Sequence, residues 1–125
     1  MVKLLLVGMG GFLGSISRYI VSGLAYRFTD APHLAIGTLS VNVLGCLAIG
    51  FLGGLADHHQ LFPPEIRAMV FIGFLGGFTT YSTFGYETFG FARNGQWLAA
   101  LITVGMHLVL GLGAVWGGYA LSKGL

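Results

Sequence analysis

The chain has 125 residues, enough for one domain, and 55% of them are hydrophobic while only 8% are charged. A soluble domain carries about 25% charged residues, so this composition excludes an ordinary water-soluble globule. The net charge of +2 is too small to suggest nucleic-acid binding, and the single cysteine, Cys46, supports neither a disulfide framework nor a cysteine metal cluster.

Four long apolar stretches follow one another along the chain. The first covers residues 3–27 and is interrupted inside only by Arg18, and the second covers residues 34–56 without a charge. The third and fourth cover residues 66–91 and 95–122. A membrane-crossing helix needs ~20 mostly apolar residues, whereas strands of an outer-membrane barrel would alternate in hydropathy. The sequence therefore predicts an all-α membrane protein, in which residues 1–125 form a single transmembrane domain of four helices.

Glycine is frequent inside these stretches, and the chain contains 22 glycines. Several are spaced four residues apart: Gly10 and Gly14, Gly50 and Gly54, Gly73 and Gly77, Gly113 and Gly117. In lipid, small residues at this spacing let helix backbones approach closely. We therefore interpret most of these glycines as packing positions and not as functional groups.

Polar residues are concentrated in the third stretch. Gly76 and Gly77 precede a run of small hydroxyl-bearing residues, which are Thr79, Thr80, Ser82 and Thr83. Polar groups in lipid are costly and usually face a bundle interior or a water-filled path. A continuous helix gains little from such a cluster, whereas unwound carbonyl groups can coordinate a cation. The cluster therefore predicts that the third helix is broken near its middle.

Further polar and aromatic residues extend this cluster into one possible track. At helical spacing Thr80, Thr83 and Glu87 share a face, and Tyr81 and Phe84 form a neighbouring aromatic pair. The second stretch adds Asn42, and the fourth adds Thr103 and His107, which are four residues apart. Together these side chains could line a narrow polar path with aromatic walls.

Ordinary interpretations of the same residues remain open. Asn42 and His107 could each make a hydrogen bond to a neighbouring helix and do nothing more. Glu87 and Arg18 could extend from the helix ends toward the membrane surface. The density of hydroxyl groups near mid-membrane depth favours a functional role for the cluster as a whole.

Basic residues are divided almost evenly between the two expected sides of the membrane. One side holds Lys3, Arg67 and Lys123, and the other holds Arg27 and Arg93, with Arg18 leaning toward it. Cytoplasmic loops normally carry an excess of Lys and Arg, so this chain has almost no preferred orientation. A protein that inserts both ways can form an antiparallel, dual-topology homodimer, and inverted repeats are a common basis of transport pathways.

Three segments carry recognisable motifs in the same order as the helices. They are GGFLGSISRY at residues 10–19, GTLSVNVLG at residues 37–45 and GFLGGFTTYSTF at residues 73–84. Together they resemble the first-, second- and third-helix signatures of the Fluc (CrcB) family of fluoride channels. The resemblance covers the whole chain in length and helix count, and it is weakest in the fourth helix.

The resemblance implies an antiparallel homodimer with two separate fluoride pores and a structural, untransported Na⁺ at its centre. The carbonyl groups expected to hold this Na⁺ belong to Gly76 and Thr79. Arg18 matches a basic residue near the vestibule of the pathway. The expected fluoride pathway contains Asn42, Tyr81, Ser82, Thr83, Phe84, Glu87, Thr103 and His107. Tyr81 departs from the family, which usually has phenylalanine there, so its hydroxyl could donate to the ion, point away or narrow the pore.

The expected function is passive export of fluoride across the cell membrane, which lowers its toxicity without any enzymatic step. The implied partners are the fluoride ion, a second copy of the chain and the lipid bilayer, with no nucleic acid. One alternative is a small proton-coupled multidrug exporter, which needs a membrane-embedded acid and has only Glu87 available. A second alternative is a membrane structural or assembly protein without transport activity.

Overall fold

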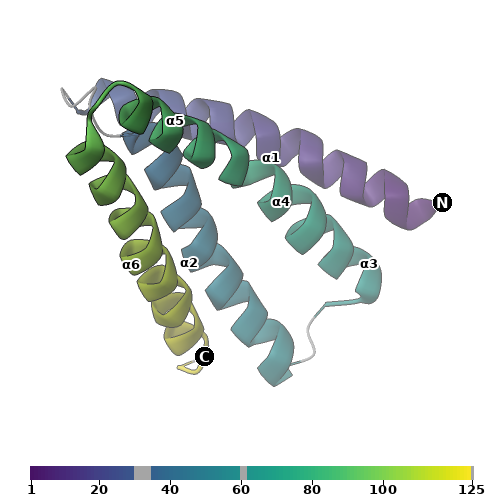
Figure 1. Cartoon of the computed structure of the whole chain (residues 1–125). Helices are drawn as coiled ribbons and strands as arrows, with labels where there is room; N and C mark the ends of the chain where they lie inside the picture. The colour runs from purple at the N-terminus through teal and green to yellow at the C-terminus, as the bar shows by residue number, and fades with distance from the viewer. Residues whose placement is uncertain (30–34, 60–61, 125) are drawn as a thin grey trace.

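The computed structural model describes residues 1–29, 35–59 and 62–124 of the chain (Figure 1). Its helices are α1 (Val2–Arg27), α2 (Ile36–His59), α3 (Pro64–Arg67), the π-helix η1 (Ala68–Leu75), α4 (Gly76–Phe78), α5 (Tyr81–Arg93) and α6 (Trp97–Ser122). The segments α3 to α5 follow one another and form the third of four spans with the length and apolar composition of a membrane crossing. The prediction of an all-helical protein with four membrane-spanning helices is therefore confirmed.

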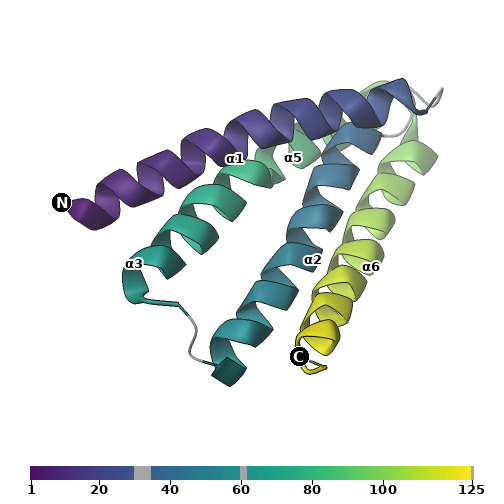
Figure 2. The same ribbon diagram turned by 180° about the vertical axis from the view of Figure 1, so that it is seen from behind.

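The four spans are arranged as two pairs. α1 lies beside the third span, and α2 lies beside α6, as both Figure 1 and Figure 2 show. The pairs converge where α1 ends and α6 begins, and they diverge toward the opposite end. At that opposite end the Nζ atom of Lys3 lies 3.7 Å from Oε1 of Glu65, which links the start of α1 to α3. Both side chains are well exposed, so this ion pair adds little to stability.

Glycine allows direct backbone contact between α1 and the third span. A methyl group on Gly14 would overlap the carbonyl oxygen of Phe74, and one on Gly77 would overlap the backbone of Gly11. These contacts lie along the glycine spacing that the sequence indicates for packing. Close approach of backbones is therefore the basis of this helix pair.

The pair formed by α2 and α6 is packed in the same way, although with a different set of glycines on α6. A methyl group on Gly50 would overlap the carbonyl oxygen of Val115, and one on Gly118 would overlap the backbone of α2. A methyl group on Gly113 or Gly117, which have the expected spacing, would have no atom of another helix within 4 Å in the described parts of the chain. The face of α6 that meets α2 therefore contains Gly118 and not the expected pair.

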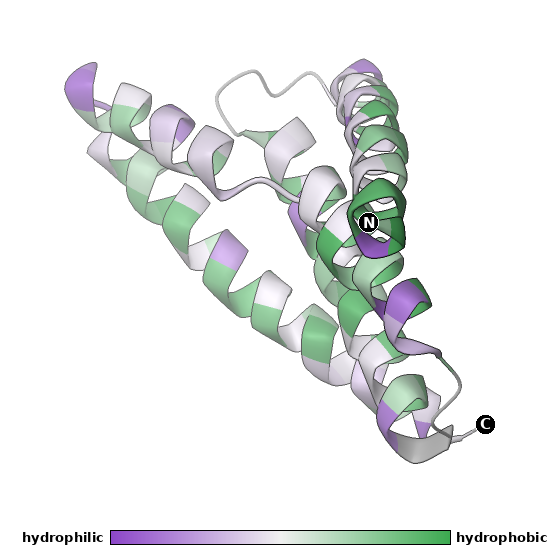
Figure 3. Ribbon diagram, turned by 90° about the vertical axis from the view of Figure 1, so that its right-hand side faces the viewer, coloured by the Kyte–Doolittle hydropathy of each residue, from purple (hydrophilic) through white to green (hydrophobic). Residues whose placement is uncertain are grey.

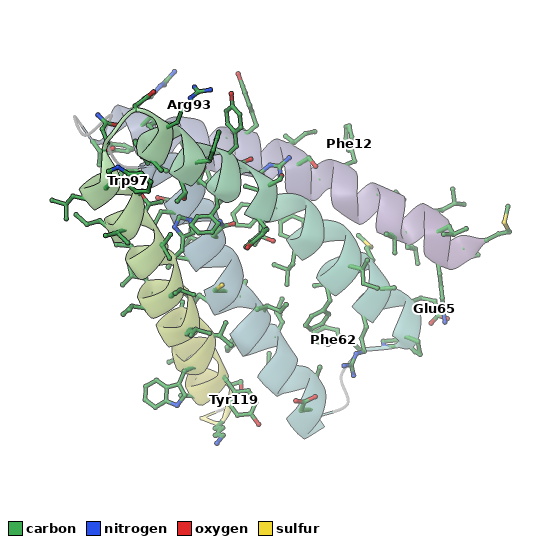
Figure 4. The ribbon with its side chains drawn as sticks, in the orientation of Figure 1. Phe12, Phe62, Glu65, Arg93, Trp97 and Tyr119 are labelled. Carbon is green, nitrogen blue, oxygen red and sulfur yellow. The ribbon has the colours of Figure 1, made fainter. Side chains whose placement is uncertain are left out.

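Large apolar side chains cover the outside of the molecule. Phe12 is 67% exposed and Trp97 is 65% exposed, and apolar residues recur along the length of the helices (Figure 3). Figure 4 shows Phe12 projecting away from the middle of α1, whereas Trp97 and Tyr119 lie near the two ends of α6. Aromatic residues near span ends and apolar residues between them are typical of a protein surrounded by lipid.

Candidate functional site

The third span is interrupted at Thr79 and Thr80. Both residues have extended backbone, with φ −85° and ψ 159° at Thr79 and φ −149° and ψ 116° at Thr80. Threonine hydroxyls compete with helical hydrogen bonds by bonding to nearby backbone groups, and Oγ1 of Thr79 donates to the Leu75 carbonyl at 2.9 Å. The interruption lies inside the hydroxyl cluster that predicted it.

Asn42 on α2 holds the interruption with both ends of its side-chain amide. Its Nδ2 atom donates to the carbonyl oxygen of Thr80 at 3.0 Å, and its Oδ1 atom accepts from the Thr80 N–H at 2.8 Å. An asparagine amide has two N–H hydrogens, so one hydrogen remains for a further partner. Asn42 therefore makes the interhelical hydrogen bond that the sequence left open, and it makes it to the broken backbone.

Thr80 also begins the second half of the third span. Its Oγ1 atom accepts from the N–H of Thr83 at 3.3 Å and donates to Oγ1 of Thr83 at 2.9 Å. A threonine in this position is an N-cap, which satisfies one of the free N–H groups at the start of α5. The start of a helix carries a partial positive charge, so the interruption is a favourable place for an anion.

The carbonyl groups just before the interruption lack the partners of a continuous helix. In an α-helix each would accept from the N–H four residues further along, but the Thr80 N–H bonds to Asn42 instead. Within the described residues, no backbone N–H donates to the carbonyl groups of residues 76–79. Carbonyl oxygens are suitable ligands for hard cations, so Gly76 and Thr79 have the chemistry expected of a cation site.

A cavity of about 410 Å³ opens between α2, the third span and α6. Its walls include Asn42, Tyr81, Phe84 and His107. The ring centroids of Tyr81 and Phe84 are 5.6 Å apart, and those of Phe84 and His107 are 4.3 Å apart. Three rings from two helices therefore form one continuous wall beside the interruption.

A second cavity, of about 810 Å³, shares Thr80 with the first as a lining residue. Arg18, Ser22 and Tyr26 line it at intervals of one helical turn along α1. The sequence placed Arg18 at a vestibule but did not include Ser22 or Tyr26. Their positions four and eight residues after Arg18 are the signal that could have found them, because this spacing places all three on one face of the helix.

Comparison with known proteins assigns the family. The model of the family described as CrcB-like protein, Camphor Resistance (CrcB), matches residues 5–119 of the chain. The chain belongs to the CrcB family. The resemblance of the three motifs to this family is thereby confirmed.

Related proteins match this CrcB chain over almost its entire length. The protein of Nitratidesulfovibrio vulgaris (strain DSM 19637 / Miyazaki F) named "Fluoride-specific ion channel FluC" is 43% identical, and the match covers 98% of each chain. Proteins with the same name from Chlorobaculum tepidum and Maridesulfovibrio salexigens are 44% and 40% identical, over 98% and 97% of this chain and 96% and 95% of theirs. This CrcB protein is a multi-pass membrane protein and not an enzyme, as the sequence predicted.

The structure separates the expected pathway residues of this CrcB chain into groups. Asn42, Tyr81, Phe84 and His107 line the smaller cavity, and Thr83 lines the larger one. The remaining expected residues, Ser82, Glu87 and Thr103, line neither of these two cavities.

Two of these remaining residues, Thr103 and Glu87, have buried side-chain atoms. Thr103 is 3% exposed, and its hydroxyl donates to the carbonyl of Ala99 at 2.8 Å, so it is bonded to its own helix. Oε2 of Glu87 is buried and has no hydrogen-bond partner within the described residues, and the same is true of Oγ1 of Thr88. The sequence analysis did not include Thr88 in the expected site. A polar residue inside a membrane span is itself an indication of a functional role, and Thr88 lies next to Glu87 in such a span.

Proposed function

We propose that this CrcB protein is a fluoride-selective passive channel that exports fluoride from the cytoplasm. The observation that carries the proposal is the interrupted third span, where Thr80 lines two cavities beside neutral hydrogen-bond donors and aromatic rings. Relatives that match almost the whole chain are named fluoride-specific ion channels, which supports the same function.

The lining chemistry suits a small, strongly hydrated anion. A channel must replace the water around fluoride with many weak donors, since a single strong site would trap the ion. Asn42 has a free amide hydrogen, Thr83 contributes a hydroxyl, and the edges of the Tyr81 and Phe84 rings carry partial positive charge. Arg18 lines the larger cavity and would raise the local concentration of anions without standing beside the rings.

The working unit that we propose is an antiparallel homodimer with two pores. Its support is the even division of basic residues between the two sides and the exposure of the aromatic wall, where Tyr81 is 84% exposed in the single chain. A second copy would enclose this wall, and four spans alone are too few to surround a polar path. Tests of orientation and of dimer formation in membranes address this part of the proposal separately.

A structural Na⁺ is the cation that we propose for the interruption. The carbonyl groups of Gly76 and Thr79 would hold it, because they lack backbone donors and carbonyl oxygen suits a hard cation. No cluster of three or more acidic, histidine or cysteine side chains able to hold a metal occurs in the described parts of the chain. The ion would add positive potential near the anion path.

Export by this channel needs no pump. Hydrogen fluoride crosses bilayers and ionises in a less acidic cytoplasm, where the anion would be trapped without a pathway. An inside-negative potential of 100 mV favours outward movement of one negative charge by about 2.3 kcal/mol. This corresponds to more than a tenfold concentration ratio at equilibrium, because about 1.4 kcal/mol is one factor of ten.

A flux measurement in liposomes tests the proposal. Purified protein is reconstituted in liposomes loaded with KF or KCl, valinomycin is added, and efflux is followed with fluoride and chloride electrodes. We expect rapid loss of fluoride, slow loss of chloride and no proton movement coupled to the fluoride flux. Absence of fluoride efflux from folded protein would overturn the channel function, and coupling to protons that Glu87→Gln abolishes would favour an exporter.

A further inference from the structure

We propose that protonation of His107 turns the fluoride pathway from a poorly conducting state into a well-conducting one. The inference rests on the proposed channel function and adds a response to acid to it. His107 lies on α6 and contributes the third ring of the wall, next to Phe84, which in turn contacts Tyr81.

The hydrogen bond of Nδ1 determines how the neutral ring is protonated. Nδ1 lies 2.8 Å from the carbonyl oxygen of Thr103, one helical turn earlier. A carbonyl oxygen only accepts hydrogen bonds, so Nδ1 must carry a hydrogen in both the neutral and the charged ring. In the neutral ring Nε2 is therefore an unprotonated nitrogen with a lone pair.

Nε2 is the atom that changes when the ring gains a proton. It is buried and has no hydrogen-bond partner within the described residues. In the neutral ring it carries a lone pair, and the ring adds no positive charge beside the cavity. In the charged ring it carries a hydrogen, and the delocalised positive charge makes the potential in the adjoining cavity more favourable for an anion. The Phe84 ring, with its centroid 4.3 Å from that of the imidazole, stabilises this charge.

The other titratable residues near this cavity do not ordinarily change charge between pH 5 and 8, whereas the imidazole does. α6 packs against α2 and α5, and the titratable residues that these helices contribute to the same cavity are Cys46 and Tyr81. Glu87 follows Phe84 by one turn on α5 and interacts electrostatically with Tyr26 of α1. Imidazole is the side chain that ordinarily changes charge between pH 5 and 8, which neither a thiol nor a phenol does.

Acid is also the condition in which fluoride export is most needed. More of the external fluoride is then in the neutral, membrane-permeant form, so more anion is released in the cytoplasm. A pathway that becomes a better anion conductor as His107 gains a proton would match export to this load.

The test is the pH profile of fluoride efflux from liposomes with equal pH on both sides, at pH 5.5, 6.5 and 7.5. Efflux should rise several-fold between pH 7.5 and pH 5.5, because imidazole gains a positive charge in acid. Protein-free liposomes measure leakage of hydrogen fluoride, which is subtracted. His107→Gln should remove the rise, whereas a His58→Gln and His59→Gln double variant, which leaves His107 in place, should keep it.

Nitrogen NMR of imidazole-labelled wild-type protein provides a readout that does not depend on the variants folding. We expect a hydrogen on Nδ1 of His107 at pH 7.5 and a fluoride-dependent shift of Nε2 at pH 5.5. Wild-type efflux that is present but independent of pH, a rise that persists in His107→Gln, or a hydrogen on Nε2 at pH 7.5 would each overturn the inference. Absence of efflux at every pH would instead overturn the proposed function, and the inference with it.

Discussion

The two helix pairs and the interrupted third span are stabilised in opposite ways. In the pairs, backbones touch because glycine has no side chain, as where Gly14 meets Phe74 and Gly50 meets Val115. At the interruption, side chains replace missing backbone bonds, as where Asn42 bonds to both backbone groups of Thr80. The comparison indicates that the scaffold tolerates added atoms poorly, whereas the site depends on a few polar atoms being present.

The largest effect is expected from adding one methyl group to the scaffold. Gly14→Ala should lower the free energy of unfolding by about 3 kcal/mol, because the new Cβ overlaps a backbone oxygen that cannot move independently. Gly8→Ala on the same helix is the matched control, since its new Cβ would have no atom of another helix within 4 Å among the described residues. This variant should change stability by less than about 0.5 kcal/mol. Unfolding in detergent measures both, and equal losses would contradict the backbone-contact interpretation.

The next effect is expected at Asn42. Asn42→Ala removes two hydrogen bonds and leaves the Thr80 backbone unpaired, which should cost about 1–3 kcal/mol and abolish most fluoride efflux. Asn42→Asp keeps the acceptor for the Thr80 N–H but loses the donor to its carbonyl, so it should be intermediate in stability. Ser40→Ala on the same helix is the control and should leave both measurements unchanged. Full efflux in Asn42→Ala would show that the interruption holds its shape without this side chain.

Much of this arrangement is predictable because it depends on local composition. The four spans follow from the length of apolar stretches, and the interruption follows from two glycines and a dense run of hydroxyl groups. These features need no knowledge of which helix lies beside which. The all-helical fold and the place of the break were therefore accessible from the sequence alone.

The features that could not be predicted from the sequence depend on how the helices pack against one another. Asn42 was identified as a pathway residue, but its partner lies 38 positions away, and no local pattern connects it to Thr80. On α6 the expected pair, Gly113 and Gly117, has the correct spacing, yet the face that meets α2 contains Gly118. Helix rotation is set by contacts along the whole pair, so spacing alone does not select the buried face.

A smaller effect is expected from the N-cap of α5. Thr80→Val keeps the branched shape but removes the oxygen that accepts from the Thr83 N–H, which should cost about 1 kcal/mol. Thr80→Ser retains a capping oxygen and should recover most of this loss. Unfolding measurements on the two variants side by side test the cap, and a Thr80→Val protein as stable as Thr80→Ser would mean that the cap is dispensable.

The smallest effect on stability is expected from Tyr81→Phe, and it distinguishes the ring from its hydroxyl. The Tyr81 side chain is 84% exposed in the single chain, and no hydrogen bond of its hydroxyl occurs within the described residues, so stability should change by less than about 0.5 kcal/mol. If the ring edge faces the ion, fluoride efflux should stay within about twofold of the wild type, because Phe has the same edge.

Phe84→Leu, which removes the neighbouring ring, is the comparison and should reduce efflux strongly. A large loss in Tyr81→Phe would mean that the hydroxyl itself donates to fluoride, and that a polar atom contributes to this wall as it does at the interruption.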